Sequence, residues 1–191
     1  MNRRKAIMRI SLGGAGLAAA FGGYEWFNLT KSPDVAYVER NRELLAALAE
    51  TIIPATDTPG AREAGVADFI VMMIRECTER KSQNKFITGL KDLQDHCEGV
   101  YKRPYQHLEA AQQESVLALF EKKSRHTGGI VGKVQDRYLG KSFFTILKEY
   151  TVEGYCTSEA GATRGLAYVN VPGKFQGCVP MLPGQKGWAT N

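Results

Sequence analysis

The strongest constraint on the fold is a helical spacing of apolar residues between positions 41 and 155. The clearest instance is a run of residues three or four positions apart, namely Phe86, Leu90, Leu93, Cys97 and Tyr101. Side chains at that spacing share one face of an α-helix, and an apolar face has to be buried against another element. The pattern therefore predicts a domain of packed helices.

Four further segments show the same helical spacing of apolar residues. Residues that start or stop helices mark the ends of some of these segments. Asn41 can cap a first helix, which Pro54 ends, and Gly128-Gly129 interrupts the chain before the last helix. The apolar faces of these segments are Leu45, Leu48, Ala49 and Ile52; Phe69, Ile70, Met73, Ile74 and Cys77; Val116, Leu117 and Phe120; and Phe143, Phe144, Leu147 and Tyr150. We expect a compact all-α domain of about five helices over residues 41–155.

The helical spacing disappears after Tyr155. Residues 156–191 are rich in glycine and proline, and Pro172-Gly173 and Pro183-Gly184 predict turns. Long connections without regular structure are usually functional or bound to a partner. We therefore expect a long irregular C-terminal arm, residues 156–191, that docks on another chain.

The N-terminal segment, residues 1–23, is typical of an export signal. The consecutive pair Arg3-Arg4 precedes a short stretch rich in glycine and alanine, and this layout resembles a twin-arginine (Tat) signal. The apolar part is too short to span a bilayer comfortably. The Tat translocase exports folded proteins, which suggests that a partner holds a cofactor. We expect residues 24–40 to be a linker; whether the signal is cleaved is left open.

Two other interpretations of the N-terminus are weaker. One is a generic basic helix. The other is a dinucleotide-binding fingerprint, because Gly14 to Ala19 spell G-x-G-x-x-A and Asp34 follows at a suitable distance. A real fingerprint follows a buried apolar strand, whereas several cations precede this one. The match is therefore ascribed to chance.

The charge of the chain argues against nucleic-acid binding. The formal net charge is +5, but Arg3, Arg4, Lys5 and Arg9 all fall in the first nine residues. Nucleic-acid binding needs basic residues clustered on a folded face. The sequence offers no such cluster after the signal segment.

Catalytic signatures are missing from the sequence. His96, His107 and His126 are scattered without a metal-binding spacing, and no C-x-x-C-H haem motif, P-loop or G-x-S-x-G elbow occurs. Ser158 has no evident histidine and aspartate partners. We therefore predict no catalytic, cofactor-binding or metal-binding residue in this chain.

The four cysteines leave several pairings open. Cys77 and Cys97 lie on apolar helix faces, where buried free thiols are common. Cys156 and Cys178 bracket much of the arm, and a bridge between them would stabilise it by about 3 kcal/mol if unstrained. Alternatively, either cysteine bonds to another subunit. The sequence does not decide between these arrangements.

Two blocks of sequence resemble a known family. Ile52 to Ala61 read IIPATDTPGA, Glu153 to Gly161 read EGYCTSEAG, and a closing motif spans Pro172 to Cys178. Together they resemble subunit 3, the small subunit of membrane-associated gluconate 2-dehydrogenase. The resemblance covers most of the chain after the signal. Cys156 departs from it, because the family usually has an aromatic residue there, whereas Cys178 matches.

The resemblance implies a complex of three components. A large subunit of the glucose-methanol-choline oxidoreductase type carries FAD and oxidises a sugar or sugar acid. A multihaem cytochrome c subunit passes electrons to the membrane quinone pool. The small subunit is non-catalytic: it carries the Tat signal, escorts the folded large subunit to the periplasm, and stabilises it at the inner membrane surface. The substrate is chosen by another chain.

We expect the subunit interface in the second block and the arm, where aromatic residues stand in a glycine-rich context typical of interface anchors. The predicted interface residues are Tyr155, Thr157, Ser158, Glu159, Gly161, Tyr168 and Phe175. Two alternatives are a stand-alone periplasmic binding or anchoring module and an enzyme whose active loop lies at residues 156–165.

Overall fold

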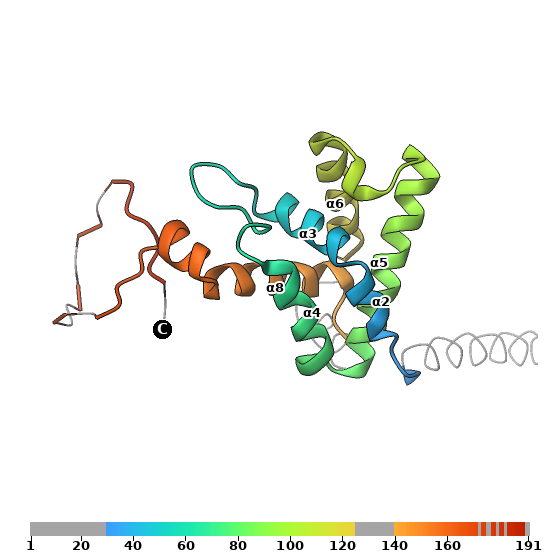
Figure 1. The fold of residues 1–191 in the computed structure, drawn as a ribbon, viewed down its shortest axis with the longest axis horizontal. Coiled ribbons are helices and arrows are strands. Elements are labelled where there is room, and N and C mark those ends of the chain that lie inside the picture. The colour runs from blue at the N-terminus through green and yellow to red at the C-terminus, as the bar shows by residue number, and fades with distance from the viewer. Residues whose placement is uncertain are drawn as a thin grey trace, which may run out of the picture.

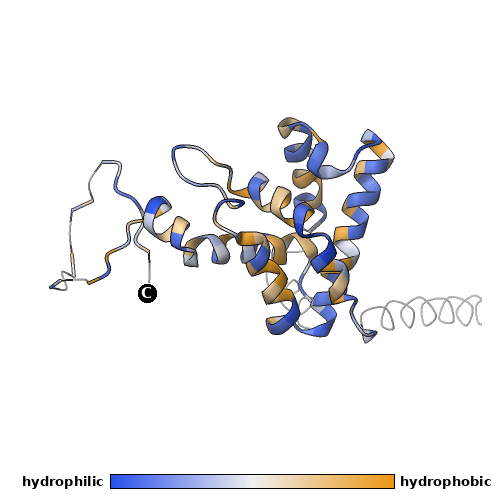
Figure 2. Cartoon of the chain, viewed as in Figure 1, coloured by the Kyte–Doolittle hydropathy of each residue, from blue (hydrophilic) through white to orange (hydrophobic). Residues whose placement is uncertain are grey.

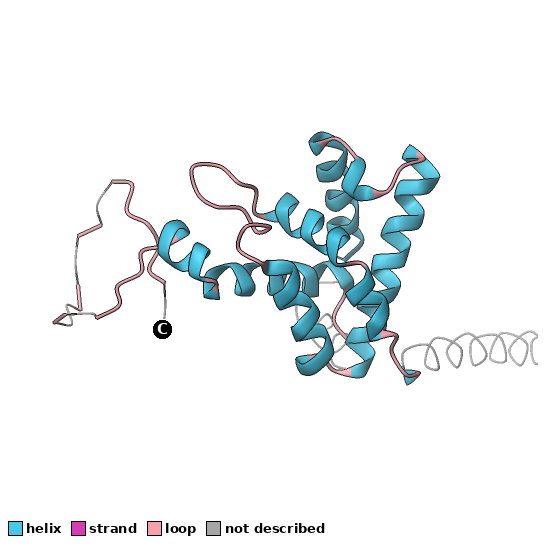
Figure 3. Cartoon of the chain, in the orientation of Figure 1, coloured by secondary structure: helices cyan, strands magenta, loops and turns pink. Residues whose placement is uncertain are grey.

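The computed structural model describes residues 30–124, 140–171, 173–174, 177–178, 180–181 and 183–189. The predicted signal segment, the first part of the predicted linker and Phe175 lie outside this range. Within it the chain is helical, and its β structure is limited to an isolated bridge between Ala167 and Trp188 (Figure 3). The prediction of an all-α fold is confirmed. No helix in these ranges is long and apolar enough to cross a membrane.

The predicted helices correspond to elements of the structure (Figure 1). In chain order the elements are α2 (Val35–Arg40), α3 (Arg42–Ile52), α4 (Val66–Met72), the π-helix η1 (Met73–Cys77), α5 (Arg80–Tyr101), the 3-10 helix η2 (Tyr105–His107), α6 (Ala110–Ser124), α8 (Phe143–Thr157) and the π-helix η3 (Gly161–Gly165). The five predicted helices are α3, α4 with η1, α5, α6 and α8.

Two boundaries differ from the sequence prediction. Residues 35–40 are helical rather than linker, because the Asp34 carboxylate accepts the Tyr37 amide and Val38 is fully buried. One buried apolar residue is too little to produce a helical period. At the other end, helical backbone continues past Tyr155 through α8 and η3, where small residues carry no apolar spacing.

Helix α8 is central, because it packs against α3, α4, α5 and α6. The apolar faces of these helices meet in one core, and Figure 2 shows hydrophobic segments of ribbon where the helices come together. Residues of this core with no exposed surface include Leu45, Leu48, Ile70, Ile74, Phe86, Leu90, Leu93 and Leu147. The core holds the N-terminal half of α8, and its C-terminal end projects toward the arm (Figure 1).

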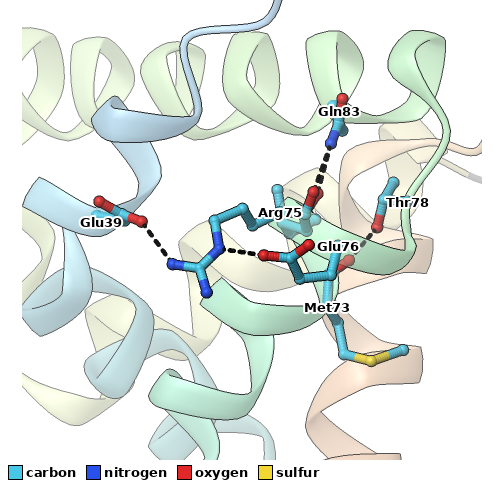
Figure 4. Close-up of polar contacts among 7 residues, drawn as sticks. Glu39, Met73, Arg75, Glu76, Thr78 and Gln83 are labelled. Atoms are coloured by element: carbon cyan, nitrogen blue, oxygen red, sulfur yellow. Dashed lines mark hydrogen bonds and ion pairs between the residues drawn. The ribbon is translucent and has the colours of Figure 1, made fainter.

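The π-helix η1 is closed by side chains that satisfy its carbonyl groups (Figure 4). Gln83 Nε2 donates to the Ile74 carbonyl at 2.7 Å, and Thr78 Oγ1 donates to the Met73 carbonyl at 2.8 Å. The last carbonyls of a helix have no partner within the helix. The bond from Gln83 explains why a glutamine is buried at the start of α5.

Arg75 links η1 to α2 at the surface (Figure 4). Its Nη1 lies 3.2 Å from Glu39 Oε1, and its Nε lies 2.7 Å from Glu76 Oε1. All three side chains are about half exposed. Exposed ion pairs of this kind contribute about 0–1 kcal/mol, so the position of α2 depends mainly on the packing of Val38 and Tyr37 against the core.

Two glycines of α5 provide a matched test of this packing. A Cβ on Gly89 would lie 2.3 Å from Phe143 Cβ, whereas nothing lies within 4 Å of the same position on Gly99. We expect Gly89→Ala to lower the free energy of unfolding by about 1–3 kcal/mol, because Phe143 packs against Phe86 and Phe120 and has to move. Gly99→Ala should raise it by about 0.5–1 kcal/mol. Urea denaturation measures both, and equal effects would contradict the close packing.

Candidate functional site

The two sequence blocks, far apart in the chain, meet at one end of the helical domain. The loop at residues 53–65 joins α3 to α4, and the segment at residues 153–165 comprises the end of α8 and η3. Tyr155 Oη donates a buried hydrogen bond of 2.8 Å to the Pro59 carbonyl. Both segments lie on the side of the domain from which the arm extends (Figure 1). We call these two segments together the junction.

Glu50 fixes the loop of the junction from the last turns of α3. Its Oε1 accepts the Ala55 amide at 2.9 Å and its Oε2 accepts the Arg62 amide at 2.8 Å. A Cβ on Gly60 would lie 2.7 Å from the Ala55 backbone nitrogen and 2.3 Å from Glu50 Oε1, so the loop closes over the carboxylate only with glycine there. Hydrogen bonds to a carboxylate are stronger than those between neutral groups. The first sequence block is therefore a preformed loop.

The end of α8 is closed by residues predicted for the interface. Ser158 Oγ donates to the Tyr155 carbonyl at 2.7 Å and accepts the Gly161 amide at 3.0 Å. A Cβ on Gly161 would lie 1.9 Å from the Tyr155 carbonyl oxygen, which requires glycine at this position. Thr157 Oγ1 donates to the Glu153 carbonyl at 2.7 Å. These residues build the turn that directs the chain into η3.

An ion pair joins the two halves of the junction at the surface. Arg164 Nη2 lies 2.6 Å from Glu63 Oε1, and Lys186 Nζ, from the arm, donates to the Arg164 carbonyl at 2.5 Å. Two shallow polar depressions flank the pair, with volumes of about 530 and 370 Å³. Thr56 and Asp57 line the larger one, and Glu159 lines the smaller. The junction thus presents a polar surface of mixed charge.

The arm is a closed loop whose two ends lie together. The Ala167 amide donates to the Gly187 carbonyl at 2.8 Å, and the Ala189 amide donates to the Ala167 carbonyl at 3.0 Å. Among its described residues, the large apolar side chains that this loop exposes are Tyr168, Val169, Val171, Met181 and Trp188. Exposed apolar groups gathered in one segment usually mark an interaction site.

The predicted interface residues do not all face solvent. Tyr155 is 8% exposed and packs inside the chain, and Gly161 is buried. Thr157, Glu159 and Tyr168 are exposed, and Ser158 is partly buried. Phe175 and the two signal arginines, Arg3 and Arg4, lie outside the described residues. The assignment of these residues to an interface stays a prediction.

Sequence reasoning missed several residues that the structure brings into this site. Glu50 gave no signal, because a carboxylate on a helix is ordinarily solvated. The exposed Val171, Met181 and Trp188 follow no period, although apolar residues in a glycine- and proline-rich segment are themselves unusual. The loop at residues 53–65 was visible only as a family block, without an indication that it touches Tyr155.

The cysteines are all free in the structure. Cys77, Cys156 and Cys178 are exposed, and Cys97 is buried. Burial raises the pKa of the Cys97 thiol to about 11, so little of it is thiolate at neutral pH. Cys156 and Cys178 are not bonded to each other. A bond from either one to another subunit stays a prediction.

No group of three or more histidine, cysteine, aspartate or glutamate side chains is placed to hold a metal ion among the described residues. A groove of about 690 Å³ lies between α6 and α8, and the charged side chains among its described lining residues are Glu121, Glu149, Glu153 and Lys148.

The comparison with protein families identifies a relationship over most of the chain. A family model described as gluconate 2-dehydrogenase subunit 3 matches residues 39–173. This range begins in α2 and ends within the arm, so it contains the whole junction. Comparisons with curated proteins and with solved structures give no match. Because the matched range is well over half of the sequence, the chain belongs to the gluconate 2-dehydrogenase subunit 3 family.

Proposed function

We propose that this chain is the non-catalytic small subunit of a periplasmic, membrane-associated dehydrogenase. Its large partner is an FAD-dependent subunit of the glucose-methanol-choline type, and a multihaem cytochrome c subunit completes the complex. Membership of the subunit 3 family supports a role inside a multi-subunit dehydrogenase. In the proposed complex the FAD and the haem groups belong to the partner chains.

The exposed apolar side chains of the arm carry this proposal. Tyr168, Val171 and Trp188 are large and exposed, whereas most apolar side chains of the described helices are buried in the core. Aromatic residues of this kind are the usual anchors of protein interfaces. A large subunit that covers them would remove their apolar surface from water, at about 25 cal/mol per Å² buried.

The junction supports the proposal because it holds the base of the arm in one place. Tyr155 binds the loop through Pro59, Arg164 binds it through Glu63, and Lys186 ties the returning end of the arm to η3. An interface that is fixed before binding loses less conformational freedom on association. The small subunit would thus present a prepared surface to the large one.

Export completes the proposed role. The large subunit would fold and bind FAD in the cytoplasm, dock on the arm, and cross the inner membrane through the Tat translocase on the signal of this chain. The proposal assigns Arg3 and Arg4 to recognition by the translocase. It also explains why the sequence combines an export signal with no cofactor motif.

The export role is tested by the double substitution Arg3→Lys with Arg4→Lys, which keeps the charge but removes the guanidinium pair. We expect dehydrogenase activity and the large subunit to stay in the cytoplasmic fraction. Arg9→Lys is the matched control and should leave export unchanged. Activity that still reaches the envelope in the double variant would refute the escort role. Failure of the native chain to purify in a fixed ratio with a flavoprotein would favour the anchoring module.

A further inference from the structure

The groove between α6 and α8 is a second surface, separate from the polar depressions of the junction. Phe144 and Val152 of α8 contribute its apolar lining. Phe144 is nearly buried, whereas Val152 is 43% exposed, a large fraction for a valine in the middle of a helix. A volume of about 690 Å³ is large enough for a chain segment with small side chains.

The charged lining of this groove favours a basic occupant. Among the described residues, three carboxylates, those of Glu121, Glu149 and Glu153, line it with the amine of Lys148. Glu149 binds Lys141 at 2.6 Å, so Glu153 is the carboxylate best placed to receive an added cation. The matching segment would combine small apolar residues with a cluster of basic ones.

The N-terminus of the chain has this composition. Arg3, Arg4, Lys5 and Arg9 precede a stretch dominated by glycine, alanine and leucine from Leu12 to Gly23. Glycine and alanine allow a backbone to approach an apolar surface closely. The four cations are complementary to the acidic lining of the groove.

The point where the chain enters the described fold makes the groove accessible to this segment. Asn84 Nδ2 donates to the Lys31 carbonyl at 2.8 Å, and the neighbouring Lys85 Nζ donates to the Gly140 carbonyl at 2.9 Å. The entry of the chain therefore lies beside the start of α8. The groove follows α8 from Phe144 to Glu153, a length of about 15 Å at 1.5 Å per residue. Residues 1–29 are more than long enough to cover it.

We propose that the N-terminal segment of this chain binds in the groove between α6 and α8 when the large subunit is absent. The apolar stretch lies on Phe144 and Val152, and the basic residues lie toward Glu153. This inference rests on the proposed export function and adds a regulatory step to it. Because Val152 and Glu153 lie in the last turns of α8, next to the base of the arm, a large subunit docked on the arm competes for this end of the groove and releases the signal.

The proposal is tested with a photo-reactive amino acid at position 152 of the purified full-length chain. We expect illumination to join position 152 to a peptide from residues 1–29, as identified by mass spectrometry. The same group at Val100, which is 59% exposed on α5, is the matched control and should give no such product. Adding the purified large subunit should reduce the product.

A charge exchange makes the test specific. Glu153→Lys should lower the yield of the product by about fivefold, the effect of losing one favourable surface pair. Combining it with Arg3→Glu and Arg4→Glu should restore the yield. Products with a second copy, products with another part of the chain, or no product would each overturn the proposal. These measurements use the isolated chain, so a negative crosslinking result would not contradict the export role. A negative export test would likewise not contradict a crosslink in the groove.

Discussion

A chain that ends at Gly165 is expected to keep its helical fold and to lose its hold on the large subunit. Every residue of the buried core precedes this point, and Tyr155 keeps its bond to Pro59. The truncation removes the exposed Tyr168, Val171 and Trp188. Interface anchors of this type contribute about 2 kcal/mol or more each, so affinity should fall by at least about a hundredfold. Co-purification with the large subunit measures binding, and circular dichroism measures the fold.

The position of the cut matters for this experiment. Ending the chain at Tyr155 would also remove Ser158, Gly161 and Gly165, which close the end of α8 against Tyr155. Weaker binding by such a truncation would have two causes, the missing arm and a disrupted end of α8, and the experiment would not separate them. Met72→Ala, on an exposed position of α4, is a control that removes apolar surface far from the arm in sequence. If the chain ending at Gly165 binds as tightly as the full chain, the junction or the helical faces carry the interface instead.

The helices and their buried faces could be predicted because the responsible signal is local. Phe86, Leu90, Leu93 and Cys97 are all buried in α5, as their spacing predicted, whereas Tyr101 is only partly buried at its end. Helical spacing of apolar residues shows which side of a helix faces the core, and it does so regardless of which other elements form that core.

The candidate site could not be predicted in the same way, because its contacts join residues without any periodic relation. The bond from Tyr155 to Pro59 spans 96 positions, and nothing in either segment specifies it. The pairing of Ala167 with Trp188 closes the arm through backbone groups, which every sequence offers. The resemblance to the subunit 3 family indicated which segments matter, and the structure explains two of their glycines and one tyrosine as parts of a single junction.

The hydroxyl group of Tyr155 offers the sharpest test of that junction. Tyr155→Phe removes the donor but leaves the Pro59 carbonyl buried, and an unpaired buried carbonyl costs about 1–3 kcal/mol. We expect the free energy of unfolding to fall by that amount, and amide exchange to accelerate across residues 53–65. Tyr155→Ala should cost about 3–5 kcal/mol, because it also leaves a cavity beside Gly165. Urea denaturation and hydrogen exchange of the isolated chain measure these effects.

Tyr168→Phe is the matched control for this series. The hydroxyl of Tyr168 makes only an exposed contact of 3.4 Å with Asn170, so its loss should change stability by less than about 0.5 kcal/mol. Equal stabilities for the two Tyr→Phe variants would mean that the bond to Pro59 contributes nothing. The ring at position 155 is covered by Gly165 and does not reach a docked partner. If Tyr155→Phe weakens binding of the large subunit, the effect must therefore act through the position of the arm. That outcome would identify Tyr155 as a positioning residue for the interface, because its own side chain is buried within the chain.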